Sequence, residues 1–211
     1  TLAMIVERQK EIDACIIEEY WELKTMYREQ EFNCQIDRLK TVDRAEKGLG
    51  YLLEKEFEIT SFEQKEGKEG NPRLYDLTSL QVDGNKKYGF SADETLKHIQ
   101  NLYEKKLVTY PRVDTSYLSE DIHPKIPGIL RGLTYYSRFT ESLLKEPIPM
   151  TKTVFNDEKV TDHHAIIPTG VNPSGISPDE QKVYDLICRR FIAVFYPPCT
   201  VSNTTVLGKV G

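Results

Sequence analysis

Apolar and polar residues alternate along the first part of the chain. The residues on one face are Trp21, Leu23, Thr25 and Tyr27, followed by Phe32, Cys34 and Ile36. The same alternation returns in FEITSFEQ, at 57–64. A period of two is typical of half-buried strands, so this region is predicted to be β-rich, with a helix end in the first dozen residues and a short helix over 45–54. The glycines and proline of KEGKEGNPR, at 65–73, mark a boundary.

Helical spacing replaces the alternation after this boundary. Ser91 and Glu94 form a capping box, and apolar residues then recur at helical intervals through about Lys106. Further helices are predicted over 120–132 and 134–145.

The last predicted helix begins after Ser177, with Pro178 in its first turn and Glu180 completing a second capping box. Its apolar stripe consists of Val183, Ile187, Phe191 and Phe195, and Pro197 and Pro198 end it. Strands followed by helices predict an α+β fold.

Composition narrows the class of protein. Of the 211 residues, 39% are hydrophobic and 29% are charged, which is ordinary for a globular protein. No apolar run approaches the roughly 18 residues of a membrane span, and no segment resembles a signal peptide, so we expect a cytoplasmic protein with no membrane partner. The first residue is not methionine and the chain starts within a helical pattern, so we expect it to be part of a longer protein.

The four cysteines are far apart and form no CxxC pair, so we expect reduced, buried thiols and no metal site. The net charge of −5 argues against a free-standing nucleic-acid clamp. That charge is uneven, because residues 1–80 carry 12 basic and 18 acidic residues, whereas 81–211 carry 16 and 15. A polyanion would therefore bind more readily to residues 81–211 than to residues 1–80.

The segment LVTYPR holds the first candidate for chemistry. Pro111 favours an extended backbone for Tyr110, and side chains two apart on an extended chain share a face, so Tyr110 and Arg112 are expected to point the same way. A guanidinium beside a phenol can stabilise its developing charge and bind a phosphate, as attack on a phosphodiester requires. The alternative is a packing tyrosine beside a surface cation.

The segment TDHHAIIPTG adds His163 and His164. A metal pair is disfavoured, since neighbours on an extended chain point apart and no third ligand is close in sequence. The other interpretation is one solvated and one core histidine.

These two segments, in this order, resemble the type IA DNA topoisomerases, and the proline after the tyrosine and the double histidine are most similar to bacterial topoisomerase III. The resemblance covers nearly the whole chain, including EEYWEL and VYDLICRRFIAVFYPP. It implies the end of a preceding helix at 1–13, the first part of a β-rich arch at 14–77, a mainly helical nucleophile domain at 78–199 and a return strand at 200–211.

The resemblance also assigns roles. Tyr110 matches the nucleophile that forms a 5′-phosphotyrosyl link, Arg112 the arginine that stabilises the scissile phosphate, and His163 the catalytic histidine. The family usually has threonine where this chain has Val113. We further expect DNA contacts from residues near these positions, namely Lys105, Lys106, Asp114 and His164.

Such an enzyme is ATP-independent, cleaves single-stranded DNA, often works with a helicase, and holds Mg²⁺ with a Toprim domain that this sequence lacks. The fragment alone is therefore expected to be inactive. Two alternatives remain: a non-catalytic module of the same fold that binds single-stranded DNA or another protein, and an unrelated tyrosine recombinase. Recombinases surround their tyrosine with several dispersed arginines and histidines, whereas only Arg112 is close here.

Overall fold

A computed structural model describes residues 2–36 and 38–211 of the chain. The fold is α+β, as predicted, and it divides into two compact units. One unit runs to Gly67 and takes in Ser202–Gly211, and the other is Lys68–Val201.

The first unit opens with helix α1 (Leu2–Asp13) and an antiparallel hairpin of β1 (Lys24–Tyr27) and β2 (Gln30–Asn33). Helix α2 (Val42–Leu53) follows. The helices and the hairpin agree with the sequence pattern. Cys34 and Ile36, which continue the alternation, lie beyond the end of β2.

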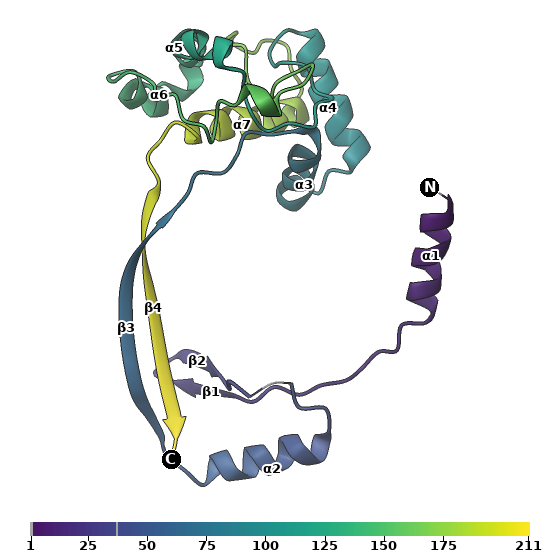
Figure 1. The fold of residues 1–211 in the computed structure, drawn as a ribbon, viewed down its shortest axis with the longest axis vertical. Helices are drawn as coiled ribbons and strands as arrows, with labels where there is room; N and C mark the ends of the chain where they lie inside the picture. The colour runs from purple at the N-terminus through teal and green to yellow at the C-terminus, as the bar shows by residue number, and fades with distance from the viewer. Residues whose placement is uncertain (1, 37) are drawn as a thin grey trace. The chain divides into compact units, whose positions relative to one another are not determined.

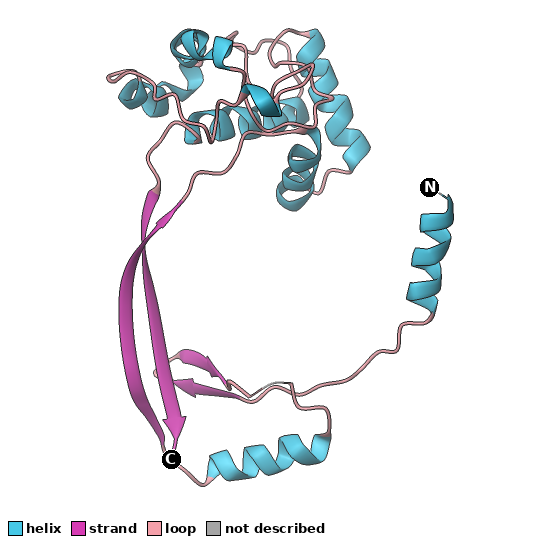
Figure 2. Cartoon of the chain, viewed as in Figure 1, coloured by secondary structure: helices cyan, strands magenta, loops and turns pink. Residues whose placement is uncertain are grey.

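The long strands β3 (Phe57–Glu69) and β4 (Cys199–Val210) form a second two-stranded sheet and run in opposite directions (Figure 2). Strand β3 continues through Gly67, within the segment expected to break it. Glycine weakens a strand without ending it, whereas Pro72 has no N–H to donate to a ladder, so β3 ends shortly before that proline.

Three half-buried aromatic side chains form a cluster in this unit. Phe57 of β3 packs against Tyr27 and Phe32 of the hairpin, with ring centroids 5.4 and 4.9 Å away. A Cβ on Gly208 would lie 2.1 Å from the Phe57 ring, so the ring occupies space that only glycine leaves free.

The second unit is mainly helical. Its α-helices are α3 (Leu77–Tyr88), α4 (Ala92–Glu104), α5 (Ile126–Gly132), α6 (Ser137–Leu143) and α7 (Pro178–Ala193). Helices α3, α4 and α7 pack against one another (Figure 1). The two predicted capping boxes, at the starts of α4 and α7, are confirmed. Helix α3, whose capping box pairs Asp76 with Ser79, was not predicted from the sequence.

The segments predicted as helical over 120–132 and 134–145 are helical, but each begins as a 3-10 helix. The first consists of a 3-10 helix, Glu120–Lys125, followed by α5; the second consists of a 3-10 helix, Thr134–Tyr136, followed by α6, and ends at Leu143. Pro124 lies inside the first 3-10 helix, where its missing N–H disfavours a continuous α-helix.

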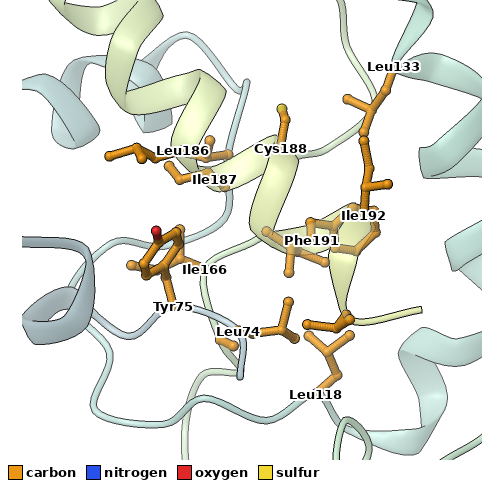
Figure 3. Close-up of a cluster of buried hydrophobic side chains, with 14 of the residues drawn as sticks. Leu74, Tyr75, Leu118, Leu133, Ile166, Leu186, Ile187, Cys188, Phe191 and Ile192 are labelled. Carbon is orange, nitrogen blue, oxygen red and sulfur yellow. The ribbon is translucent and has the colours of Figure 1, made fainter. Parts of the chain in front are cut away.

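The core of the second unit is built around the predicted apolar stripe of α7, and Phe191 of that stripe is completely buried. Loop residues Leu74, Leu118 and Ile166 lie near it in the same buried cluster (Figure 3). The irregular segments thus contribute side chains to the same core as the helices. The expectation of four buried cysteines is correct for Cys188 alone, because the three others are exposed.

Candidate active site

Residues of both predicted motifs line one open cleft of about 400 Å³. Tyr110 and His163 both line it, with ring centroids 4.5 Å apart and ring planes inclined by 37°. Tyr110 is half-buried and His163 is exposed. The phenol of Tyr110 and the imidazole of His163 therefore both lie at one solvent-accessible cleft.

The position of Tyr110 depends on how α4 ends. Lys106 adopts a left-handed conformation, with φ of 60°, and its N–H donates to the carbonyl of Tyr103 at 2.8 Å. The chain then turns back, and Leu107 and Val108 are buried. Tyr103, at the end of α4, meets the Tyr110 ring edge-on at 5.5 Å.

The turn aligns the tyrosine segment with the segment after the histidines. The N–H of Thr109 donates to the carbonyl of Ile167 at 2.9 Å, and the N–H of Thr169 donates to the carbonyl of Leu107 at 3.0 Å. An antiparallel bridge joins Val108 to Pro168 between these bonds. The contact between the two motifs thus depends on backbone pairing between two segments that are far apart in the sequence.

Burial alternates along the segment after Tyr110. Pro111 and Val113 are buried, whereas Arg112 and Asp114 are exposed and Tyr110 is partly so. This alternation agrees with the expectation that Tyr110 and Arg112 lie on one side of the chain. Arg112 and Asp114 nevertheless lie outside the set of residues that line the cleft. Val113 packs in the hydrophobic core, where an apolar side chain is suited.

Both histidines line the cleft, at a point where the backbone bends over 161–163. The expectation that only one of them points toward Tyr110 and Arg112 stays a prediction. His164 is half-buried, and its Nδ1 lies 2.8 Å from the carbonyl oxygen of Ala165. A carbonyl can only accept, so Nδ1 carries the proton. His163 is the histidine in ring contact with Tyr110.

Lys105, an expected DNA contact, has partners within the unit. Its ammonium lies 2.9 Å from a carboxylate oxygen of Glu180 and also donates to the carbonyl of Gly175 at 3.0 Å. Lys106 is exposed, and its carbonyl accepts a hydrogen bond from the Thr169 hydroxyl at 2.7 Å. The DNA contacts expected of these lysines remain predictions.

Three aspartates that were not predicted as site residues also line the cleft: Asp121, Asp157 and Asp162. A hydrogen bond from Ser119, with help from Lys125, holds the pKa of Asp121 below its usual value despite some desolvation. Asp157 accepts a hydrogen bond from the N–H of Glu120 at 2.8 Å. Asp121 and Asp157 lie in short 3-10 helices and Asp162 lies in a bend, and these elements are too short for a periodic pattern to mark them.

Tyr117 is a second tyrosine close to Tyr110 in sequence, and the structure places it differently. It is only 7% exposed, and its hydroxyl accepts a hydrogen bond from Lys159 at 3.3 Å. The guanidinium of Arg73 lies over its ring. A buried phenol held in this way is less available to a substrate than Tyr110.

The chain is similar over its whole length to DNA topoisomerases. A sequence model of the DNA topoisomerase family matches residues 1–211. DNA topoisomerase 3 of Bacillus cereus is 38% identical over 225 residues, which cover 100% of this chain and 30% of that protein. DNA topoisomerase 3 of Bacillus subtilis is 38% identical over 221 residues, with the same coverage. The chain thus spans about 30% of the length of these relatives.

A solved structure shows the same fold. Full-length topoisomerase I from Thermotoga maritima superposes with a TM-score of 0.70 and covers 99% of this chain and 35% of the other. The two sequences are 21% identical in this alignment. This similarity therefore lies in the fold, that is, in the arrangement of the helices and strands.

Proposed function

Because this chain belongs to the DNA topoisomerase family, we propose that it carries the tyrosine-bearing part of a type IA active site. The observation that supports this most directly is the contact of Tyr110 with His163 in an open cleft. Motif matches alone would not require the two side chains to meet, and here their ring centroids are 4.5 Å apart.

The proposed reaction is a transesterification. The phenol oxygen of Tyr110 attacks a phosphodiester of single-stranded DNA, a bond forms from phosphorus to that oxygen, and the bond to the 3′-oxygen breaks. The phenol proton leaves and the 3′-oxygen gains a proton. One ester replaces another, so no ATP is consumed, and attack by the 3′-hydroxyl reverses the step after a strand has passed.

His163 and Arg112 have complementary roles in this proposal. The imidazole of His163 beside Tyr110 exchanges a proton or donates a hydrogen bond to the scissile phosphate. Arg112, exposed on the same side of the chain as Tyr110, is free to reach the charged phosphate of bound DNA.

The resemblance to type IA enzymes implies Mg²⁺, and the described residues do not fit that ion. Across 2–36 and 38–211 there is no group of three or more His, Cys, Asp or Glu side chains that could hold a metal. Any ligands would come from another part of the full-length protein. We therefore expect residues 1–211 alone neither to nick DNA nor to relax supercoils.

Other properties carried by the resemblance remain proposals, namely a helicase partner and a location in the bacterial cytoplasm. No helix in the described part of the chain is long and apolar enough to cross a membrane.

The test of the proposal is a covalent adduct. In the full-length protein, Tyr110→Phe removes only the attacking oxygen, so it should abolish the adduct and leave binding of a labelled single-stranded oligonucleotide within a few-fold. Tyr103→Phe is the matched control, because its ring touches Tyr110 without being the proposed nucleophile. The DNA should be attached through its 5′-phosphate. An adduct that persists in Tyr110→Phe, or attachment through the 3′-phosphate, would contradict the assignment.

A further inference from the structure

The residue before the proposed nucleophile is bonded to the histidine segment three times. The Thr109 hydroxyl donates to the carbonyl of Ala165 at 3.2 Å and accepts from the N–H of Ile167 at 3.0 Å. Its own N–H donates to the carbonyl of Ile167 at 2.9 Å. One side chain therefore bridges two backbone groups that flank Ile166, adjacent to the Tyr110–His163 contact.

The backbone partners of these bonds are buried, whereas Thr109 itself is half-buried. Ala165 and Ile167 are 0% and 2% exposed, so a partner lost by either backbone group is not readily replaced by water. The Ala165 carbonyl also accepts the Nδ1 proton of His164. The hydroxyl of Thr109 is thus linked, through one carbonyl, to the segment that carries both histidines.

The only proton of the hydroxyl is committed. It is directed to Ala165, and the oxygen accepts from Ile167, although Thr109 itself lines the cleft. This arrangement argues against donation to a substrate and for control of geometry.

We propose that Thr109 is a positioning residue, whose hydroxyl fixes the register between the Tyr110 and His163 segments and so the distance between those two rings. This inference rests on the proposed role of Tyr110. The backbone bonds from Thr109 to Ile167 and from Thr169 to Leu107 remain when the hydroxyl is removed. Loss of the hydroxyl therefore loosens the site while the fold persists.

The test uses the full-length protein with Thr109→Val, which removes the hydroxyl at nearly constant volume, and Thr109→Ser, which keeps it. Single-turnover cleavage at saturating oligonucleotide should be about 10- to 100-fold slower in Thr109→Val, because small displacements of reacting groups cost rates of that order. Oligonucleotide affinity should stay within a few-fold, and Thr109→Ser should cleave within a few-fold of the parent.

The matched control is Thr95→Val. The hydroxyl of Thr95, like that of Thr109, donates to a backbone carbonyl, here that of Ser91 at 3.0 Å. Thr95 lies within α4 and is completely buried, whereas Thr109 is half-buried. Thr95→Val should cleave like the parent even if its melting temperature falls. Should Thr109→Val fail to fold, Thr109→Ala provides the comparison with Thr109→Ser.

The outcomes separate the two proposals. If Thr109→Val cleaves like the parent, if Thr109→Ser is as slow as Thr109→Val, or if Thr95→Val is equally slow, the positioning role is wrong. If instead Tyr110→Phe still forms the adduct, the proposed function itself fails, whatever the threonine variants do.

Discussion

Glu180 is a buried carboxylate on which α4 and α7 converge, and its replacement by glutamine gives a quantitative test of the fold around the site. Its side chain is 6% exposed. It accepts hydrogen bonds from the N–H of Ser177 at 2.8 Å, from Lys105 at 2.9 Å and from Asn101 at 2.9 Å. Asn101 lies in α4 and Lys105 follows directly after it, so the carboxylate fixes the start of the Tyr110 segment.

The pKa of Glu180 reflects the strength of the hydrogen bonds that its carboxylate accepts. Burial opposes ionisation, but the bonds from Ser177, Lys105 and Asn101 outweigh it and lower the pKa to about 2. A shift from the ordinary value of 4.5 corresponds to about 3 kcal/mol. Lys105 is 38% exposed, so solvent screens part of the interaction, and we expect a loss of about 2 kcal/mol for Glu180→Gln at pH 7.

The sign of the pH dependence follows from the lowered pKa. The contribution is complete above the unfolded pKa of about 4.5 and is lost as the pH falls towards the folded pKa. By pH 3 roughly half or more should be gone. The difference in unfolding free energy between parent and Glu180→Gln should therefore be largest at neutral pH and shrink below pH 4.5.

The assay is thermal and denaturant unfolding followed by helical circular dichroism from pH 7 to pH 3. At neutral pH, the melting temperature should fall by about 4–8 °C in Glu180→Gln. Glu94→Gln is the matched control, because Glu94 holds the same capping-box position in α4 but is exposed. A loss in Glu94→Gln as large as in Glu180→Gln, or a Glu180→Gln difference that is constant with pH, would refute the reasoning.

Three further predictions concern packing, thiol chemistry and catalysis. A Cβ at Gly132 would lie 2.1 Å from the carbonyl oxygen of Gly170, so Gly132→Ala should lower the melting temperature clearly, whereas Gly128→Ala in the same helix meets nothing within 4 Å and should be neutral or slightly stabilising. Burial raises the pKa of the Cys188 thiol to about 12, so mass spectrometry after alkylation of native protein should find it unmodified while the other three cysteines react. In the full-length protein, His163→Ala should slow single-turnover cleavage about 10²-fold and His164→Ala much less; the reverse order at unchanged melting temperatures would transfer the role to His164.

Helix starts that depend only on residues close together in the sequence could be predicted. The boxes of Ser91 with Glu94 and of Ser177 with Glu180 combine a hydroxyl and a carboxylate three residues apart, and both helices begin there. Helix α3 was not predicted because Ser79 takes the position that glutamate holds in the usual capping box.

The candidate site could be predicted only in part. Its motifs are contiguous in sequence, so Tyr110 and His163 could be named, but their contact depends on pairing between 107–109 and 167–169. No local pattern encodes a pairing over such a separation. The bend at 161–163 and the position of both histidines at the cleft also depend on tertiary context.

The placement of Tyr110 and His163 in one compact unit bears on the proposed strand-passage mechanism. The tyrosine segment is bonded to its surroundings repeatedly, since Leu77 donates to the carbonyl of Val113 at 3.1 Å and Ala165 donates to the carbonyl of Tyr117 at 2.9 Å. Both proposed catalytic groups lie within Lys68–Val201, so a movement of this unit as a rigid body leaves their 4.5 Å contact intact. Such a movement would change only their distances to groups outside the unit. A gate that opens in this way can keep the tyrosine and its histidine arranged for resealing throughout the cycle.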